Sequence, residues 1–368
     1  MRRLFKEVPE HLWRSYRWQV ENAVTTKEEL KKYLRLTPEE EKAFPTVTRL
    51  YPFAVTPYYL SLINPEDPED PLRRQVVPRV EEVNPRLQRD ASENPFNEES
   101  SLPGLTHRYP DRVLMVVSNF CVSYCRHCMR KRLFKEGPRS RSYEELKRMI
   151  EYVRRRESVR EVLISGGEPL ALPLEKLEFI LKELRSIPHL EVIRIGTRLP
   201  VFAPMRFYDE RLLALLERYG PIWIATHFNH PNELTPYAEE AVERLLRAGV
   251  PVFNQTVLLK GVNDEPEVLE RLFRGLIRMK VKPQYLFHCD PVKGVLHFRT
   301  SVRKGLEIVR RLRGRLSGYA IPVYALDLPG GKGKVPLEYP YLRRAEGNRY
   351  LFESPLGGLV EYEIDEGP

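Results

Sequence analysis

Residues 113–128 read VLMVVSNFCVSYCRHC, an apolar strand-like run followed at once by three cysteines. A continuous apolar run of this kind is typical of a strand buried in a parallel sheet. Further runs lie at 162–164, 192–195, 222–225, 252–258, 285–287 and 323–326, and helical stretches lie at 142–156, 173–185, 236–248 and 266–279. This alternation predicts an α/β fold, a complete or partial barrel. Its chemistry should follow the carboxyl ends of the strands.

The composition is that of a globular protein. The chain has 368 residues, of which 42% are hydrophobic and 30% charged, and this balance excludes a mainly disordered chain. No apolar run is long enough to cross a bilayer, and the first residues do not resemble a signal peptide, so we expect a cytoplasmic protein. The net charge of +9 is dispersed, which favours an anionic cofactor as much as nucleic acid.

The three clustered cysteines indicate a metal or cluster site. Cys121, Cys125 and Cys128 are spaced by four and three residues, and four cysteines in the whole chain are too few for a disulfide framework. Three thiolates at this spacing can hold three irons of a [4Fe-4S] cluster and leave the fourth iron open. The alternative is a closed structural zinc, for which His127 or Cys289 would have to supply the fourth ligand.

A second motif follows the run 162–164, where the sequence continues with Gly166, Gly167 and Glu168. The glycines allow the backbone to approach a ligand closely, and the carboxylate can accept from an ammonium group. A glycine turn capped by an acid is the alternative. Together the CxxxCxxC and Gly-Gly-Glu motifs resemble the radical S-adenosylmethionine (SAM) superfamily, in which the amino and carboxylate groups of SAM chelate the open iron.

Further stretches narrow the resemblance to the lysine 2,3-aminomutase family. They lie at 107–113, 226–233, 258–264, 297–300 and 329–334, and the similarity extends over nearly the whole chain. The resemblance implies an isomerase that uses SAM, a [4Fe-4S] cluster and pyridoxal 5′-phosphate (PLP) to move the amino group of L-lysine from the α to the β carbon, giving β-lysine.

The resemblance also implies the domain organisation. Residues 106–315 would form a partial (β/α) barrel of the radical SAM type. Residues 1–105 would form an N-terminal helical and extended arm, in which recurring prolines from 64 to 95 exclude long helices. Residues 316–368 would form a C-terminal segment that carries the PLP lysine.

Two groups of residues are expected to bind PLP. A PLP enzyme needs a lysine for its resting Schiff base and a basic cradle for the phosphate. Lys334, which ends a glycine-rich stretch, matches the family's PLP lysine, and Lys332 is its rival. Arg108, Tyr109 and Arg112 resemble the family's phosphate-side residues, and the planar fork of arginine suits a phosphate.

Three residues are expected to bind the substrate. Arg130 matches the arginine that pairs with the substrate carboxylate, and Asp290 and Asp327 match the acids that receive its ε-ammonium group. Two carboxylates would compensate a buried ammonium and repel a glutamate side chain. The alternative is that these aspartates, which end strands, cap helices.

Three further residues are expected near SAM or PLP: Gln255, His227 and His230, although either histidine could equally be a satisfied core residue. Two stretches, 94–99 and 129–134, depart from the best-matching lysine enzymes, which weakens the substrate assignment more than the reaction type. Longer family members carry further cysteines that bind zinc. The last cysteine here is Cys289, so no zinc is predicted.

The expected partners are a free amino acid, an electron donor such as flavodoxin or ferredoxin, and further copies of the chain. No nucleic acid or membrane partner is expected. Four alternatives stay open: glutamate as the substrate, a lysyl residue of translation elongation factor P as the substrate, a SAM radical enzyme without PLP, and a zinc-stabilised RNA-binding protein.

Overall fold

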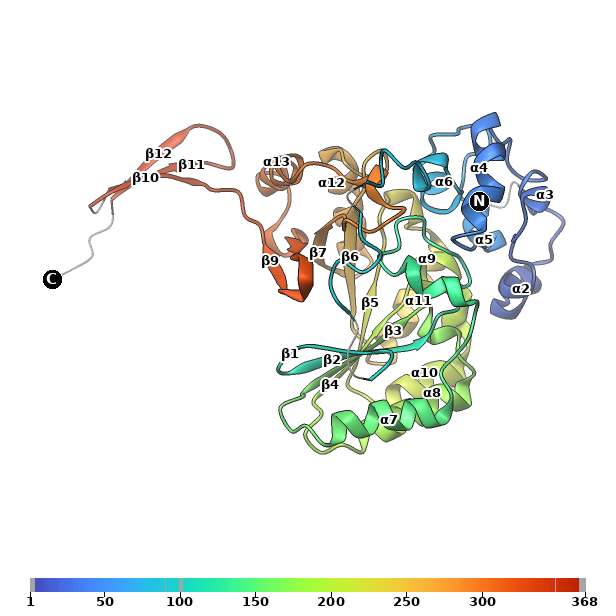
Figure 1. Cartoon of the computed structure of the whole chain (residues 1–368). Helices are drawn as coiled ribbons and strands as arrows, with labels where there is room; N and C mark the ends of the chain where they lie inside the picture. Colours follow the sequence, from blue (N-terminus) through green and yellow to red (C-terminus); the bar gives the residue numbers. More distant parts are fainter. Residues whose placement is uncertain (1–3, 90, 99–101, 348, 364–368) are drawn as a thin grey trace.

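The computed structural model describes residues 4–89, 91–98, 102–347 and 349–363. Within these ranges nine strands form one sheet in sequence order, as Figure 1 shows. The strands are β1 (Leu105–Tyr109), β2 (Arg112–Ser118), β3 (Glu161–Gly166), β4 (Val192–Gly196), β5 (Ile222–Thr226), β6 (Val252–Leu258), β7 (Lys282–His288), β8 (Val323–Asp327) and β9 (Lys334–Pro336). Strands β2 to β8 are parallel, and β1 and β9 pair antiparallel with β2 and β8.

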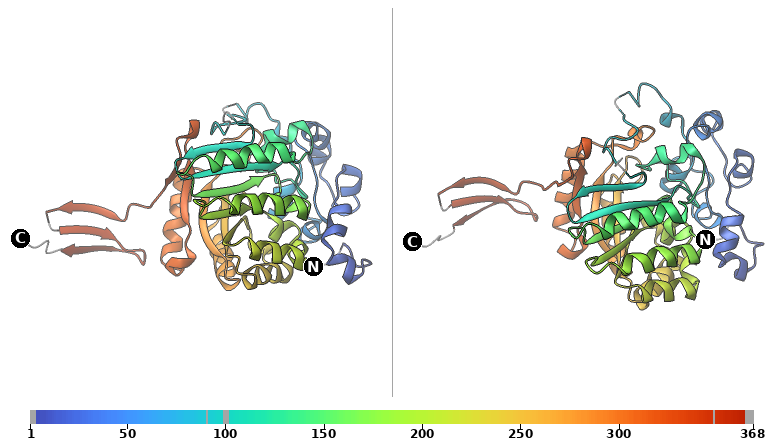
Figure 2. Two further views of the ribbon diagram at one scale, coloured as in Figure 1. Left: turned by 90° about the horizontal axis from the view of Figure 1, so that it is seen from below. Right: turned by 60° about the horizontal axis from the view of Figure 1, so that its bottom comes forward.

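Amphipathic helices make the crossovers between the parallel strands. They are α7 (Tyr143–Arg154), α8 (Leu174–Arg185), α9 (Leu199–Phe202), α10 (Glu210–Arg218), α11 (Pro236–Arg247), α12 (Pro266–Arg278) and α13 (Val302–Arg313). In α7 the buried residues are Leu146, Met149, Ile150 and Val153, which form one stripe with helical spacing. Ser142 and Glu145 form a capping box that begins this helix. The longer helices α8, α10, α11, α12 and α13 have similar stripes, and the helices cover the outer face of the curved sheet (Figure 2).

The sheet is an open, partial barrel, and the predicted fold class is confirmed. The strand order ends at β1 and at β9, and no pairing joins these two edges in the described residues. Every run predicted as a strand forms one, with bounds that differ by three residues or fewer. Strands β1 and β9 were not predicted, because their short polar sequences carry no apolar period.

Short helices make up the N-terminal region, and α6, which lies in the proline-rich stretch 64–95, has only six residues. They are α1 (Glu10–Trp13), α2 (Tyr16–Glu21), α3 (Lys27–Leu30), α4 (Pro38–Thr48), α5 (Pro57–Leu60) and α6 (Pro71–Val76). They pack beside the barrel on the side away from β9 (Figure 1). Hydrogen bonds attach this arm to the barrel, for example from the Tyr124 amide to the Ala54 carbonyl. The arm therefore supports the loop that follows β2.

The last strands form a separate sheet. Strands β10 (Leu342–Glu346), β11 (Arg349–Glu353) and β12 (Leu359–Glu363) are antiparallel and project away from the barrel (Figures 1 and 2). Strands β8 and β9, which lie in the predicted C-terminal segment, belong to the main sheet. The division at residues 105 and 315 stays a prediction. In the ranges that the structure describes, no helix is long and apolar enough to cross a membrane.

Candidate active site

The carboxyl ends of the parallel strands open into one pocket of about 880 Å³. Fifteen residues predicted from the sequence line it: Arg108, Tyr109, Arg112, Cys121, Cys125, Cys128, Arg130, Gly166, Gly167, Glu168, His227, Gln255, Asp290, Asp327 and Lys334. The residue predicted for the site but absent from this lining is His230. Since these side chains come from segments more than 200 residues apart, the fold alone brings them together.

The loop after β2 carries the three cysteines, and the N-terminal arm holds it in place. The amide of Arg126 donates to the carbonyl of Gln75 in α6 at 2.7 Å. Burial, together with the neighbouring Cys125, raises the pKa of Cys128 to about 11. Burial also raises the pKa of Cys121 well above its usual range, and Cys128 adds to this shift. Burial and the charges of the neighbouring thiolates thus both disfavour ionised cysteines here. A positively charged group between the sulfurs would stabilise the thiolates.

The donor set fits an iron–sulfur cluster better than a single ion. In the described part of the chain, no three His, Cys, Asp or Glu side chains converge on a point where one metal ion could sit. A cubic cluster needs no such point, because each thiolate binds a different iron. All the described cysteines are free, so the three sulfurs are available as ligands.

The Gly-Gly-Glu turn packs directly against the cysteine loop. A Cβ atom on Gly166 would lie 2.2 Å from the Ser118 carbonyl oxygen, and one on Gly167 would lie 2.3 Å from that of Phe120. Glycine is therefore required here for backbone contact within the protein, in addition to the expected approach of a ligand. Glu168 follows, and burial raises its pKa to about 7. Glu168 lines the pocket with the cysteines, and its carboxylate accepts from the Leu170 amide at 3.2 Å, so it also caps the short 3₁₀ turn that follows.

Lys334 lies on β9, the last strand of the main sheet, and also lines the pocket. Its Nζ is 2.8 Å from Asp327 Oδ2, and its backbone amide donates to the hydroxyl of Tyr109 at 2.9 Å. The guanidinium of Arg112 covers the Tyr109 ring at 3.8 Å. Lys332 is exposed and does not line the pocket. The residues present therefore fit PLP, with an amine for its aldehyde and arginines for its phosphate.

Two carboxylates of the pocket lie near this lysine. Burial raises the pKa of Asp290 to about 7, and the nearby charge of Asp327 adds to the shift. Lys334 and Arg130 act in the opposite direction. No side-chain hydrogen bond or ion pair of Asp290 is recorded in the described residues, and Asp327 is bonded to a lysine ammonium. Neither carboxylate caps a helix, and the pair forms a site suited to an ammonium group.

Arg130 has a partner that the sequence did not reveal. Its Nη2 and Nε atoms donate to Glu98 Oε1 at 2.7 and 3.1 Å. Arg132 donates to Glu98 Oε2 at 2.9 Å. Two guanidinium groups thus share one carboxylate, which leaves one positive charge for an incoming anion. The sequence offered no signal for this contact, because Glu98 lies in an irregular acidic stretch.

The segment that carries Glu98 crosses the gap between the two edges of the open barrel. The amide of Gly330, near β9, donates to the Pro95 carbonyl at 2.8 Å. On the β1 side, Thr106 Oγ1 donates to the Glu98 carbonyl at 2.6 Å. The segment therefore closes the pocket where no strand pairing does.

The remaining predicted residues divide into two kinds. His227 and Gln255 line the pocket, and burial lowers the pKa of His227 to about 4, so this imidazole is neutral at pH 7. The Nδ1 of His230 instead accepts from the amide of Asn232 at 3.2 Å and begins a short 3₁₀ turn. A structural role explains His230.

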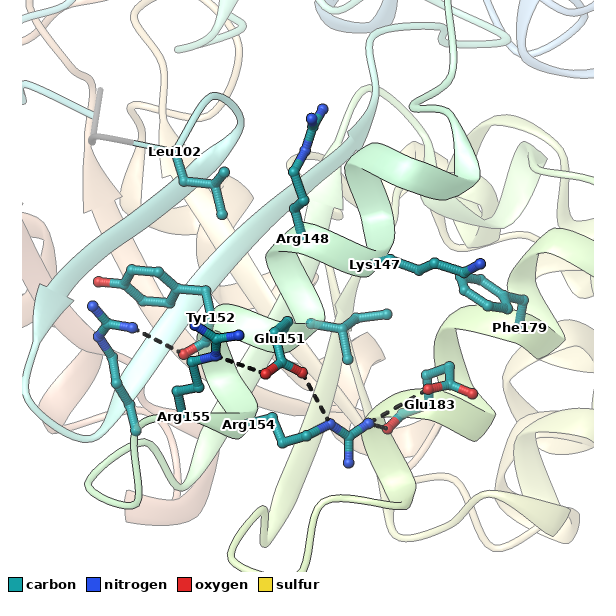
Figure 3. A pocket seen from close by; sticks show the side chains of 11 residues that line it. Leu102, Lys147, Arg148, Glu151, Tyr152, Arg154, Arg155, Phe179 and Glu183 are labelled. Carbon is teal, nitrogen blue, oxygen red and sulfur yellow. Dashed lines mark hydrogen bonds and ion pairs between the residues drawn. The ribbon is translucent and has the colours of Figure 1, made fainter.

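A second cavity, of about 800 Å³, lies on the outer face of α7 and α8 (Figure 3). Four of its charged side chains form ion pairs, as Arg155 does with Glu151 at 2.7 Å and Arg154 with Glu183 at 3.4 Å. It shares no residue with the pocket at the strand ends. Its composition is that of a solvated helix surface, so the candidate active site is the pocket that holds the cysteines.

Comparison with known proteins identifies the family of the chain. Residues 115–272 match the model of the radical SAM superfamily, and residues 309–360 match that of lysine-2,3-aminomutase. The L-lysine 2,3-aminomutase of Clostridium subterminale is 45% identical over 361 residues, which cover 98% of this chain and 86% of the relative.

Two further relatives also match over nearly the whole chain. A protein of Aquifex aeolicus (strain VF5) is 64% identical over 366 residues, covering 100% of this chain and 99% of the relative. The glutamate 2,3-aminomutase of Clostridioides difficile (strain 630) is 43% identical, covering 96% of this chain and 83% of the relative. The chain belongs to the lysine 2,3-aminomutase family of radical SAM enzymes, which implies SAM and a [4Fe-4S] cluster as its cofactors.

Proposed function

We propose that this protein is a PLP-dependent 2,3-aminomutase that converts L-lysine to β-lysine. The observation that carries the proposal is the distribution of charge in the pocket. Arg130 and Arg132 share the Glu98 carboxylate and keep one net positive charge, and Asp290 and Asp327 contribute carboxylates to the same pocket. An amino acid with a carboxylate at one end and an ammonium at the other matches both.

The cofactors would occupy different parts of the pocket. Cys121, Cys125 and Cys128 would hold the cluster, and Gly166, Gly167 and Glu168 would hold SAM beside it. Lys334 would bind PLP covalently, with Arg108, Tyr109 and Arg112 around its phosphate. When bound, the cluster and SAM supply a carbon radical that starts the reaction, and PLP holds the nitrogen that migrates.

The chain's own residues bind, orient and enclose the substrate. Arg130 would hold the substrate carboxylate through the part of its guanidinium that Glu98 does not occupy. In the described structure Asp327 is bonded to the Lys334 ammonium, and it would become free for the substrate once Lys334 carries PLP. The segment from Ser92 to Glu98 would keep water out of the open side of the barrel.

Glutamate is the second candidate substrate, because a relative 43% identical bears the name glutamate 2,3-aminomutase. Two carboxylates near the substrate side chain would repel glutamate, so the charge of the site favours lysine. The test is anaerobic incubation of the reconstituted enzyme with SAM, PLP, dithionite and either amino acid. We expect β-lysine, detected by NMR, and no β-glutamate. Turnover of glutamate without turnover of lysine would refute the proposal.

We also infer that a low-potential donor such as flavodoxin or ferredoxin reduces the cluster, and that the protein acts in the cytoplasm. The free cysteines suit a reducing compartment. A homo-oligomer is supported by the projecting sheet, where Leu342, Leu359, Val360 and Tyr362 are exposed. Light scattering at micromolar concentration should give a mass above that of one chain, and a monomer would contradict this.

A further inference from the structure

Arg198, which follows β4, contacts the sulfur of Cys125. Its Nη1 atom donates to Cys125 Sγ at 3.0 Å. The other nitrogens are also engaged, because Nε donates to the His227 carbonyl at 3.0 Å and Nη2 to Glu233 Oε1 at 2.9 Å. Nη2 donates to Gln75 Oε1 at 2.6 Å as well. All three nitrogens therefore have partners, and the guanidinium has one orientation.

This guanidinium is buried and charged. Arg198 is 7% exposed and its ion-pair partner Glu233 is 0% exposed. The guanidinium carbon lies 4.4 Å from the centre of the Phe202 ring, which closes one face. In such a weakly screened environment a positive charge acts strongly on a neighbouring sulfur.

The other two cysteine sulfurs lack such a contact. Cys128 Sγ accepts from the backbone amide of Arg130 at 3.4 Å. For Cys121 no hydrogen bond to the sulfur from a charged side chain is recorded in the ranges that the structure describes. The contact is therefore specific to the middle cysteine of the motif.

We propose that Arg198 raises the reduction potential of the cluster through its hydrogen bond to the Cys125 sulfur. Reduction adds one electron to the cluster, taken from an external one-electron donor, and makes the sulfurs more negative. A fixed cation beside one sulfur stabilises the reduced state more than the oxidised state, and hydrogen bonds to sulfur are among the factors that set these potentials. No proton moves and no bond breaks at Arg198, so it acts as a positioning residue.

The backbone of the same residue serves the SAM side of the site. The Arg198 amide donates to Glu168 Oε2 at 3.0 Å, and Thr197 Oγ1 donates to Glu168 Oε1 at 2.6 Å. A change of the Arg198 side chain leaves both bonds available. The effect on the cluster can therefore be measured without removing a partner of Glu168.

The test is a redox titration of the variants Arg198→Lys and Arg198→Met. Each protein is reconstituted anaerobically, titrated with dithionite in the absence of lysine, and followed by the electron paramagnetic resonance (EPR) signal of the reduced cluster. At a fixed solution potential, we expect the ratio of reduced to oxidised cluster in Arg198→Met to be at least tenfold lower than in the unaltered protein. This corresponds to a reduction potential lower by about 59 mV for one electron. Arg198→Lys, which keeps the charge, should lie between Arg198→Met and the unaltered protein.

The matched control is Arg206→Lys. Arg206 is also 7% exposed, and its Nε donates to the Leu170 carbonyl at 2.8 Å. In the described residues no contact of the Arg206 side chain with a cysteine is recorded. The reduction potential of the cluster in Arg206→Lys should therefore equal that in the unaltered protein. The proposal is overturned if Arg198→Met holds a full cluster and its ratio of reduced to oxidised cluster stays within twofold of that of the unaltered protein. It is also overturned if Arg206→Lys shifts the reduction potential as much as Arg198→Lys does.

Arg198→Met leaves the Glu233 charge uncompensated, so iron content and melting temperature are measured first. If the Arg198 variants hold no cluster, the unaltered protein provides the test. Arginine labelled with ¹⁵N in its guanidinium is incorporated, and pulsed EPR of the reduced cluster should show ¹⁵N coupling. Absence of coupling would overturn the proposal. The proposal rests on the presence of the cluster and not on lysine turnover. The redox titration contains no lysine, so its result does not depend on whether the protein converts lysine to β-lysine.

Discussion

Asp290 provides the sharpest test of the proposed substrate site. Burial raises its pKa from 3.8 to about 7, so the protein maintains a carboxylate that is costly to ionise. A cation bound between Asp290 and Asp327 would relieve this cost. In the variant Asp290→Asn the bound ε-ammonium loses one charge-assisted bond, worth about 2–4 kcal/mol. We therefore expect the kcat/KM for lysine to fall roughly 30- to 1000-fold.

The same change should stabilise the protein when no substrate or cofactor is bound. The folded state holds a proton at Asp290 more tightly than the unfolded chain does. The unaltered protein thus loses stability as the pH rises from 3.8 to about 7. Each pKa unit corresponds to about 1.4 kcal/mol, and the half-buried side chain retains some hydration, so we expect a gain of ~2 kcal/mol at pH 8. Urea unfolding at pH 8 measures this gain, which should be absent at pH 3.5.

The control is Asp264→Asn, because Asp264 also lies in a loop that follows a parallel strand, β6. Its Oδ1 accepts from the Gly261 amide at 2.8 Å, a bond that asparagine can keep, and it does not line the pocket. Its activity should stay within threefold of that of the unaltered enzyme. Lysine turnover by Asp290→Asn at the unaltered rate would show that Asp290 is structural and would refute the reasoning.

Alanine at any one of the cluster cysteines should abolish activity and lower iron content, whereas Cys289→Ala should keep its iron, because Cys289 is buried outside the pocket. The cluster cysteines are Cys121, Cys125 and Cys128; equal iron loss in the Cys289 variant would contradict the assignment. Lys334→Ala should lose the PLP absorbance and the covalent labelling by PLP after borohydride reduction, whereas Lys332→Ala, at an exposed residue, should keep both. The reverse pattern would show that Lys332 is the PLP lysine. Glu98→Ala should raise the KM for lysine roughly tenfold with a smaller change in kcat, because Arg130 loses the bonds that fix its fork. An unchanged KM would show that Glu98 does not orient the arginine.

Local sequence patterns predicted most of the barrel and the two motifs in the pocket, whereas the other predicted site residues came from the family resemblance. Strands and crossover helices follow from the spacing of apolar residues within ten or so positions. For example, the stretch 142–156 was predicted as a helix, and α7 spans Tyr143–Arg154. Functional residues with a fixed spacing, such as Cys121 to Cys128 and Gly166 to Glu168, could also be predicted from the local sequence. Their chemistry depends on neighbours in the chain, and the parallel topology then places all of them at one edge.

The substrate residues were predicted only through the family resemblance. Nothing in the local sequence of Asp290 distinguishes it from an aspartate that caps a helix. The structure separates the two possibilities, because the half-buried carboxylate lies near Asp327 and no helix amide donates to it in the described residues. His230 is the opposite case, since its surroundings assign it a capping role.

The sequence by itself determined the order of the elements, the cluster motif and the reaction family, because each is recorded in neighbouring residues or in a whole-chain resemblance. Tertiary structure alone decided the contacts that join distant segments. Glu98 meets Arg130 across the open edge of the barrel, and Arg198 bridges α6 and Cys125. These ion pairs and hydrogen bonds depend on how the arm and the sheet edges pack. No local period or spacing encodes a contact between residues that lie tens to more than a hundred positions apart.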